Sequence, residues 1–366
     1  MKASSDWREF ELGELLTLIN GRAYKQDELL DAGTPVLRIQ NLNGGERWYY
    51  SDLSLPADKM CNAGDLLYAW SGSFGPYVWS GPKSIFHYHI WKIALTNRLD
   101  QRFAYYLLDH ITARVKAAGR GVSMLHMTKS GMEAWKVRVP PLEEQKRIAA
   151  ILDQADALRR LRARALDRLN ALGQAIFHEM FGVRIADGEL PLAELGSLAR
   201  NLDGKRVPVK KSDRGEVQGK FPYYGASGVI DFVDDFLFEG PHLLVAEDGA
   251  NLLSRSTPIA FIADGQFWVN NHAHVLAYNG LAELDFLRFF LQTLDLAPYI
   301  TGSAQPKLNQ KKLNQILVPV PHLADQRQFV AILRELEQQI SEVERSQVAT
   351  TTLFTSLQHR AFRGEL

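Results

Sequence analysis

The sequence predicts an α+β fold in which two tandem-duplicated domains of mixed α and β structure are separated by two long helices that pair as an antiparallel coiled coil. Three observations predict this fold. The second half of the chain repeats the first, each copy ends in a long helical segment, and the rest of each copy alternates strand-like runs with loops rich in glycine, serine and asparagine.

The duplication is clearest at the ends of the two copies. At a constant offset, Gly121 pairs with Gly302, His178 with His359 and Phe181 with Phe362, and upstream the offset drifts by a few residues. The segments that match best are Val139-Pro140-Pro141-Leu142-Glu143-Glu144-Gln145-Lys146 and Val320-Pro321-His322-Leu323-Ala324-Asp325-Gln326-Arg327. The copies agree least in their middles, so we expect one scaffold that presents two different surfaces.

Each copy ends in a segment with the pattern of a long helix. Prolines and then carboxylates open the segment, which suits a helix N-terminus. Apolar residues recur three and four apart, except where Arg162 interrupts the first stripe and a polar stretch at Gln347 and Thr350 interrupts the second. The stripes comprise Ile151, Ala155, Leu158, Ala165, Leu169, Leu172 and Ile176, and then Phe329, Leu333, Leu336, Ile340, Val343, Phe354, Leu357 and Ala361.

A helix of roughly 40 residues is about 60 Å long and needs a partner for so narrow a stripe. Each helix is the obvious partner of the other, and as an antiparallel pair they would act as a spacer. The alternative is that each packs on its own domain as an ordinary amphipathic helix. The arginines of the first helix suit phosphate contact, a solvated face or a subunit interface equally well; they are Arg159, Arg160, Arg162, Arg164 and Arg168.

The globular halves read as mixed α and β structure. Strands are expected at 36–39, 65–70 and 90–94 and a helix at 101–118, followed in the second copy by strands at 243–246, 258–262 and 274–277 and a helix at 283–294. The loops between them combine aromatic, small and polar residues, which suits base reading, although such residues more often belong to cores and turns. The candidate DNA contacts are Arg22, Tyr24, Trp70, Ser71, Ser73, Arg120, Ser123, Lys205, Tyr223, Tyr224, Ser227, Asn251, Ser303, Gln305 and Lys307.

Composition sets bounds on the function. The chain has 366 residues, of which 46% are hydrophobic and 23% charged, as in globular proteins. Its 42 basic and 42 acidic residues cancel, which argues mildly against a protein that coats nucleic acid non-specifically. The single cysteine, Cys61, fits a reducing cytoplasm, and neither a secretory signal nor a membrane span is expected.

Several catalytic motifs are incomplete. Gly219-Lys220-Phe221 lacks the Ser or Thr of a phosphate loop, and Gly225-Ala226-Ser227-Gly228-Val229 has valine where a nucleophile elbow has glycine. The adenine methyltransferase and helicase signatures are also missing. His87 with His89, and His272 with His274, would place two imidazoles on one face of a strand as a metal pair, but structural hydrogen bonding is the stronger expectation.

Both copies resemble the specificity subunits of type I restriction–modification systems. The segments that begin at Pro140 and Pro321, together with Phe221 to Gly228 and Gly302 to Ile316, carry this resemblance in the right order along the whole chain. One departure is that the first copy has Trp70-Ser71 where the second has Glu247-Asp248. This puts in doubt any transfer of DNA contacts from one half to the other.

The resemblance implies two target recognition domains, each reading one half of a split, asymmetric site in double-stranded DNA. The helices would set the spacing and dock two methyltransferase (modification) subunits, and restriction/translocase subunits would join them. S-adenosylmethionine, ATP and Mg would bind those partners, so this chain would be non-catalytic and hold no cofactor or metal. The expected partner contacts are Gln145, Arg147, Arg159, Arg162, Gln326 and Arg327.

The expected boundaries are a first recognition domain at 1–141, a helix at 142–182, a second recognition domain at 183–320 and a distal helix at 321–366. Two other functions remain open. One is a duplicated scaffold that bridges two partners without binding DNA. The other, a metal-dependent hydrolase built on the histidine pairs, would contain stoichiometric metal.

Overall fold

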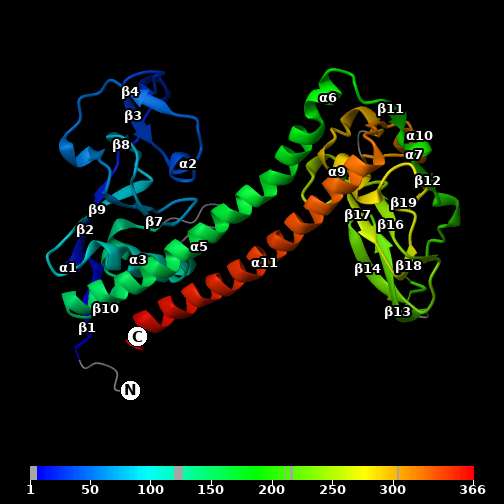
Figure 1. Ribbon diagram of the computed structural model, residues 1–366. Coiled ribbons are helices and arrows are strands. Elements are labelled where there is room, and N and C mark those ends of the chain that lie inside the picture. The colour runs from blue at the N-terminus through cyan, green and yellow to red at the C-terminus, as the bar shows by residue number, and fades with distance from the viewer. Residues whose placement is uncertain (1–5, 119–126, 211, 215–216, 303–304) are drawn as a thin grey trace. The chain divides into compact units, whose positions relative to one another are not determined.

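The computed structural model describes residues 6–118, 127–210, 212–214, 217–302 and 305–366. The chain divides into two compact units. Met1–Arg164 and Arg345–Leu366 form the N-terminal unit, and Ala165–Glu344 forms the C-terminal unit. The division differs from the expected boundaries, because it falls within the long helices and each unit contains parts of both (Figure 1).

The described residues of the N-terminal unit form three small sheets. Strand β1 (Arg8–Glu11) pairs antiparallel with β10 (Lys136–Val139). One four-stranded sheet has the order β2-β9-β6-β7, comprising Leu16–Asn20, Ile90–Leu95, Leu66–Ala69 and Gly75–Val78. The other has the order β4-β3-β8-β5, comprising Tyr49–Ser51, Thr34–Leu37, Ser84–Phe86 and Met60–Cys61.

The C-terminal unit repeats this arrangement strand for strand. Strand β11 (Leu192–Glu194) pairs with β20 (Leu317–Pro319). Its sheets have the orders β12-β19-β16-β17 (Ala199–Asn201, Ala273–Tyr278, His242–Ala246, Ala260–Ala263) and β14-β13-β18-β15 (Gly228–Val233, Gln218–Gly225, Gln266–Val269, Phe238–Glu239). Even the parallel pair recurs, as β3 with β8 and as β13 with β18. The predicted duplication is confirmed.

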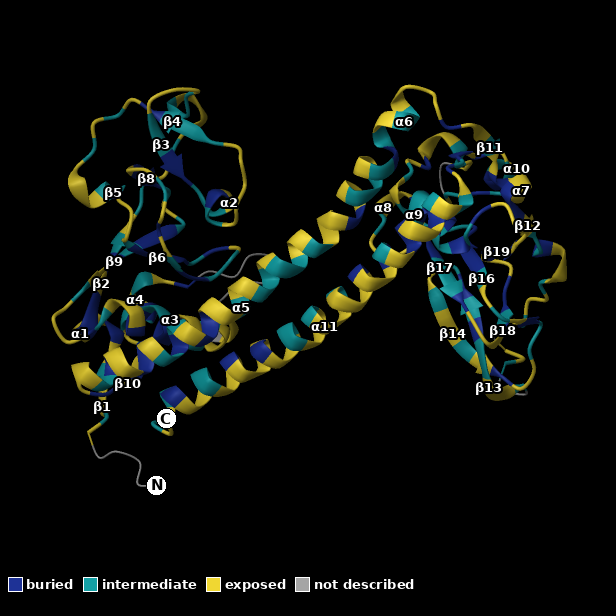
Figure 2. Ribbon diagram, viewed as in Figure 1, coloured by how far each residue is buried: buried dark blue, intermediate teal, exposed yellow. Residues whose placement is uncertain are grey.

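Helices cover these sheets where the apolar periodicity predicts them. Helix α3 (Gln101–Ala118) spans the residues expected, and its buried face carries Phe103, Leu107 and Ile111. Its counterpart α9 (Leu284–Thr293) buries Phe286, Leu287 and Leu291. Apolar residues repeat every three or four positions in both helices, so one face of each is buried in the core of its unit (Figure 2).

The shorter elements follow the same duplicated order. Helix α4 (Lys129–Glu133) corresponds to α10 (Gln310–Asn314), and in each a capping side chain, Thr128 or Asn309, accepts the backbone N–H of the third helical residue. One-turn helices α1 (Leu12–Leu15) and α7 (Leu195–Leu198) precede β2 and β12. Two further one-turn helices, α2 (Ile39–Leu42) and α8 (Asn251–Ser254), lie in loops.

Two expectations for the globular halves are corrected. Strand β3 ends at Leu37, and Ile39 begins α2 instead of ending the strand. Phe221 to Gly225, expected in a loop, belongs to the eight-residue strand β13. Its two register shifts and its proline and glycine residues hide the alternation by which a strand is recognised.

The long helices are α5 (Leu142–Phe177) and α11 (Leu323–Phe362). Helix α5 continues through a wider π turn (His178–Gly182) into α6 (Val183–Ala186). In the N-terminal unit, Arg147 contacts Leu366 and Arg162 contacts Ser346, so the segments run antiparallel. In the C-terminal unit, the rings of Phe177 and Phe329 lie 5.6 Å apart, and Gly173 lies against Leu336, again antiparallel.

The helices also pack on the domains, so both packing modes foreseen for them occur. Ile148, Leu152 and Ala155 of α5 join Phe354 and Ala361 of α11 in the core of the N-terminal unit. Phe329, Val330 and Leu333 of α11 enter the core of the C-terminal unit. Two members of the predicted stripe, Leu158 and Leu172, are exposed, because the middle of α5 has no apolar core to cover them. Among the described residues, no helix is long and apolar enough to cross a membrane.

Candidate nucleic-acid interface

Three segments of the C-terminal unit meet beyond the end of β16. The N–H of Leu308 donates to the carbonyl of Glu247 at 2.8 Å, and the N–H of Gly249 donates to that of Pro306 at 3.0 Å. These bonds hold residues 247–249 against residues 306–308. The third segment is the turn Asp203–Lys205 that follows β12.

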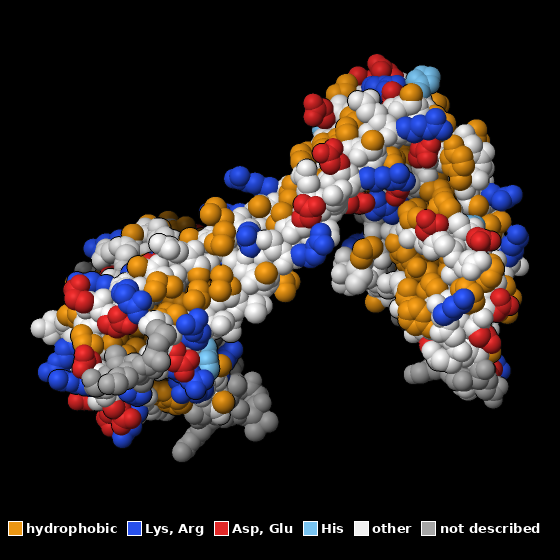
Figure 3. Space-filling model, turned by 60° about the horizontal axis from the view of Figure 1, so that its bottom comes forward, with side chains coloured by type: hydrophobic (Ala, Val, Ile, Leu, Met, Phe, Trp, Pro, Cys, Tyr) orange, Lys and Arg blue, Asp and Glu red, His pale blue; other side chains and the backbone are white. Residues whose placement is uncertain are grey.

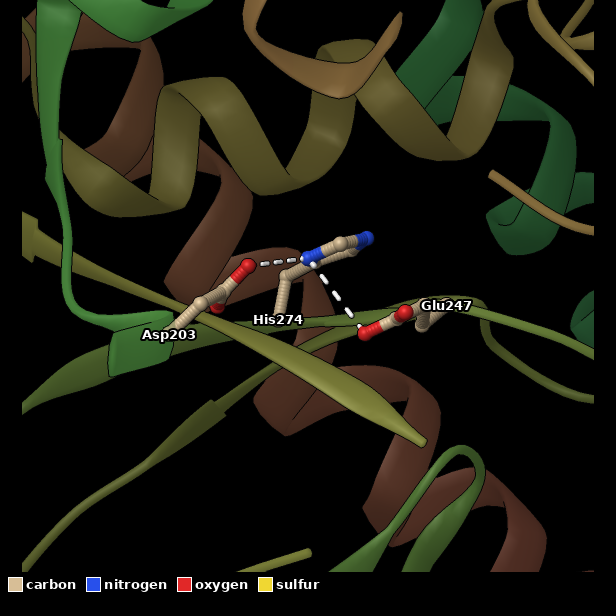
Figure 4. A group of neighbouring side chains, drawn as sticks. All are labelled: Asp203, Glu247 and His274. Atoms are coloured by element: carbon tan, nitrogen blue, oxygen red, sulfur yellow. Dashed lines mark hydrogen bonds and ion pairs between the residues drawn. The ribbon is translucent and has the colours of Figure 1, made fainter. Parts of the chain in front are cut away.

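A buried ionic cluster joins the three segments (Figure 4). His274 Nδ1 lies 2.6 Å from the Asp203 carboxylate and 3.8 Å from Glu247, and His274 Nε2 lies 2.7 Å from the Leu308 carbonyl. Arg206 Nη1 donates to Glu247 at 2.7 Å, and Lys307 Nζ lies 3.1 Å from the other Glu247 oxygen. The cluster therefore ties Lys307 and the Asp203–Lys205 turn to β16 and β19.

The carboxylates of this cluster are held ionised. Burial alone would raise the pKa of Asp203, but hydrogen bonds from His274 and the Val275 N–H, with the charges of His274 and Arg206, lower it. Burial opposes ionisation of Glu247 as well, yet Arg206, His274 and Lys307 lower its pKa. Each buried charge thus has an opposite charge beside it, as a charge away from water requires.

The cluster also bears on the metal hypothesis. Asp203, Glu247 and His274 place ligand-type atoms within 4.8 Å of one another. Both ring nitrogens of His274 are already hydrogen-bonded, and Arg206 and Lys307 supply the positive charge that a metal ion would bring. The geometry is that of a structural ion-pair network.

The histidine pairs do not lie as expected. In the second copy, His272 precedes β19, is half-exposed and contacts Asp248 at 2.8 Å, whereas His274 is buried against Asp203. In the first copy, His87 and His89 both precede β9. The two imidazoles of a pair do not lie on one strand, because each pair begins in the turn before its strand. His274 makes the structural hydrogen bonds that were the stronger expectation.

The turn after β13 joins the same group of loops. The Asn270 N–H donates to the Tyr224 carbonyl at 3.0 Å, and the Asn270 side chain accepts the His272 N–H at 2.8 Å. Since His272 also contacts Asp248, the β13–β14 turn with Ser227 is linked to the segment that follows β16.

In the N-terminal unit, aromatic side chains occupy the position that corresponds to the ionic cluster. The Trp70 ring stacks on Trp91 with centroids 5.5 Å apart, and its Nε1–H donates to the Tyr88 carbonyl at 2.8 Å. The Tyr88 N–H donates to the Arg22 carbonyl at 3.0 Å, and the Arg22 guanidinium covers the Tyr24 ring. These contacts bring Arg22, Tyr24 and Trp70 together.

Backbone pairing shows that these two places correspond. The Trp70 N–H donates to the His89 carbonyl, and the Glu247 N–H donates to that of His272. Strand register then matches Trp91 with His274 and Asn20 with Asp203. One backbone scaffold thus holds stacked tryptophans in one unit and an ionic cluster in the other.

Among the described residues of the C-terminal unit, the structure brings four candidates to this group of loops. Lys205, Ser227, Gln305 and Lys307 are exposed. Asn251 binds its own loop, because its side chain is hydrogen-bonded to residues 256 and 257. Their contacts with DNA stay predictions.

Of the two candidate tyrosines, Tyr223 needs correction, and the contact of Tyr224 with DNA stays a prediction. Tyr223 is fully buried, and its hydroxyl is hydrogen-bonded to the backbone of Val209. Tyr224 packs on Phe261 and Phe267 in a core cluster. A buried ring offers no face to a base, so Tyr223 is structural, and the half-buried Tyr224 is engaged in packing.

Among the candidates of the N-terminal unit, Ser71 is buried, and its prediction as a DNA contact is corrected for the same reason. Ser73 accepts a hydrogen bond from the Asn43 side chain at 2.9 Å. Arg22 contacts Glu28 at 2.5 Å, which holds its guanidinium within its own loop. Arg120, Ser123 and Ser303 lie outside the described residues.

The expected partner contacts divide into three pairs. Gln145 and Gln326 are buried, and their amides bind the backbone of their own units, so their assignment as partner contacts is corrected. Arg147 and Arg327 are exposed and paired with Glu144 and Glu283, and their role stays a prediction.

The last pair is engaged within the helices. Arg159 contacts Asp156 at 2.6 Å and covers the Phe354 ring. Arg162 donates to the Ser346 carbonyl at 2.7 Å and contacts the Thr350 hydroxyl. Both guanidiniums bind groups of the chain itself, and their role as partner contacts stays a prediction, as it does for Arg147 and Arg327.

Asp203 and Arg206, which flank the candidate Lys205, were not predicted from the sequence. The signal was indirect: Glu247 stands where the first copy has Trp70, and a carboxylate in a buried place requires cationic neighbours. Asp203 and Arg206 lie some 40 residues upstream of Glu247 in the sequence. Only the sheet brings them together.

Comparison with known proteins identifies the family. The model of the type I restriction modification DNA specificity domain matches residues 4–171 and again residues 191–350. The chain belongs to this family. Both matches extend into the long helices, as the compact units do.

Individual specificity subunits align with the chain. The type I restriction enzyme MjaVIII specificity subunit of Methanocaldococcus jannaschii is 23% identical over 95% of this chain and 89% of its own length. A putative type I restriction enzyme specificity subunit of Haemophilus influenzae is 40% identical, over 42% of this chain and 38% of its own length.

Solved structures share the fold. The S subunit of a type I restriction–modification system from M. genitalium has a TM-score of 0.67 at 18% identity, covering 99% of this chain and 97% of its own. A chain from a structural study of type I restriction–modification complex assembly has a TM-score of 0.55 at 19% identity and matches over the full length of both chains.

Proposed function

We propose that this specificity-subunit family member reads a split, asymmetric site in double-stranded DNA, one half-site with each unit. The observation that carries the proposal is the change of chemistry at one place in a repeated fold. The same strands hold Trp70 and Trp91 in one unit and Glu247 and His274 in the other. The two units share one fold but support their loops with different side chains, which suits two different half-sites.

The exposed residues at these loops have the chemistry of DNA contacts. Lys205 and Lys307 suit phosphates, and Gln305 and Ser227 offer hydrogen-bonding groups to base edges. Lys307 keeps donors for DNA, because its half-exposed ammonium has three N–H groups and gives one to Glu247. Removal of one base contact should weaken binding by about 1–3 kcal/mol.

The helices would dock the modification subunits and set the spacing between the half-sites. Large apolar side chains on the helical segments of the N-terminal unit are exposed, and these suit a subunit interface better than the buried glutamines do. They are Leu158, Leu161, Val348 and Leu353, between 40% and 68% exposed. We propose two modification subunits, joined by restriction/translocase subunits.

Catalysis is proposed to belong to these partners, which would bind S-adenosylmethionine, ATP and Mg. The net charge of this chain agrees with a DNA interface that the chain shares with its partner subunits. Its net charge is zero, and Lys, Arg, Asp and Glu side chains intersperse on the face in Figure 3. Because phosphate neutralisation dominates DNA affinity, tight and salt-resistant binding is expected only in the complex.

The test is co-purification with an adenine methyltransferase subunit, followed by selection of bound duplexes from a random pool. Two short specific blocks around a fixed gap are the expected result. A complex that enriches no sequence would contradict the proposal and favour a scaffold that bridges two partners. Stoichiometric metal in the purified chain would instead favour the hydrolase alternative.

A further inference from the structure

The middle of the helix pair lacks an apolar core. All residues from Asp156 to Gly173 and from Leu336 to Thr350 are described, and between these end residues neither helix has a buried side chain (Figure 2). The ends of the helices, by contrast, are anchored in the domain cores by residues such as Leu152 and Phe329. Contacts in the middle therefore determine how firmly the helices hold their alignment there.

A polar layer lies in this middle region, within the N-terminal unit. Arg162 of α5 donates from Nη1 to the Ser346 carbonyl at 2.7 Å and contacts the Thr350 hydroxyl. Thr350 is buried, and its hydroxyl also donates to the Ser346 carbonyl, at 2.7 Å. The two interruptions of the apolar stripes, one in each helix, thus meet in space.

The duplicated fold does not require this layer. At the constant offset between the copies, Arg162 corresponds to Val343 and Thr350 to Leu169, both apolar. An arginine between helices costs stability unless its donors find acceptors. Its acceptors here are two groups on one turn of α11. A slide of one helical turn, about 5.4 Å, would move the Thr350 hydroxyl out of reach, whereas a backbone carbonyl recurs on every turn of α11.

We propose that the layer formed by Arg162, Ser346 and Thr350 fixes the register of α5 against α11 and thereby sharpens the gap length accepted between the two DNA half-sites. A single polar residue in a helical seam is known to specify register at a cost in stability. The inference rests on the proposed function, and it assigns Arg162 a positioning role in place of a partner contact.

The experiment compares three variants in complex with the modification subunit. Arg162→Met keeps an unbranched side chain without donors, and Thr350→Val removes the hydroxyl with little change of shape. Arg164→Met is the matched control, because it removes the same charge from an exposed position two residues along α5. Affinity is measured for duplexes with the selected half-sites at the preferred gap and at gaps one base pair shorter and longer.

We expect Arg162→Met to reduce the preference for the best gap about tenfold relative to the control, a change of about 1.4 kcal/mol. Thr350→Val should produce a smaller loss, since the Ser346 carbonyl remains. Hydrogen exchange should accelerate in the middle of α5 and stay unchanged in α3 and α9. This pattern would separate local loosening from unfolding.

The two proposals fail in different ways. If wild-type complex enriches no split sequence, the proposed function is wrong. If the wild-type complex selects a split sequence, but Arg162→Met and Arg164→Met prefer the best gap length equally strongly, the register inference is overturned. Faster exchange without a change in gap preference would overturn it equally.

Discussion

At the residue scale, His87 is a group whose surroundings oppose its charged form. Its ring lies 4.9 Å from that of His89, centroid to centroid, in the turn before β9. Burial lowers the pKa of His87 to about 4, and the charges of His89 and Arg38 add to this. The unfolded chain should titrate this histidine near its ordinary value of about 6.5.

This difference predicts a pH dependence of stability. Between the two pKa values the unfolded state binds more protons, so the free energy of unfolding of the N-terminal unit should fall as the pH drops from about 6.5 toward 4. His87→Gln should remove that part of the fall, as measured by urea unfolding across this range. The half-exposed His272 supplies the control, and equal effects of His87→Gln and His272→Gln would contradict the prediction.

Sequence reasoning was least complete for single residues. The exposed position of Lys205 and Lys307 was predictable from their place in polar loops. Burial of Tyr223 was not, because its partner Val209 comes from another segment and the strand that carries it is irregular. A residue's type suggests its chemistry, but its neighbours decide whether it reaches the surface.

At the element scale, a buried glutamine fastens each long helix to its domain. Gln326 Oε1 accepts the Glu283 N–H at 3.0 Å, and its Nε2 donates to the Pro321 carbonyl at 2.9 Å. Gln145 does the same with the Asp100 N–H and the Pro140 carbonyl. The glutamine that recurs in both copies thus binds the start of each long helix to its domain through hydrogen bonds.

Gln326→Leu should therefore lower the free energy of unfolding by about 2–3 kcal/mol, because it leaves a backbone N–H and a carbonyl without their partners. Denaturant unfolding followed by circular dichroism measures this loss. Gln328→Leu, at an exposed position of the same helix, is the control. Similar denaturation midpoints for the two variants would show that the Gln326 hydrogen bonds contribute little to stability.

At the scale of the whole molecule, the proposal assigns separate half-sites to separate loop groups. Replacing Lys205 and Lys307 by alanine should weaken binding to DNA in the complex without changing selection at the half-site read by the N-terminal unit. For every phosphate that is no longer neutralised, the slope of log K against log salt should become shallower by about 0.9. Lys136→Ala, on the exposed side of β10, is the control.

Salt titrations of duplexes that retain one half-site or the other would make this measurement. Equal weakening at both half-sites would contradict the division of labour between the loop groups. Part of any effect of the Lys307 change passes through Glu247, which it contacts at 3.1 Å. The Lys205 change alone is free of that contribution.

The duplicated α+β architecture, the two long helices and the family were all predictable from the amino-acid sequence. These properties are written in local periodicity and in the repetition of segments such as those beginning at Pro140 and Pro321, which need no knowledge of distant neighbours. Only the folded chain shows that Gln145 and Gln326 are buried, that Asp203 contacts His274, and that Arg162 contacts Thr350. Those facts depend on contacts between residues far apart in the chain, and spacing in a single sequence carries no information about which of them form.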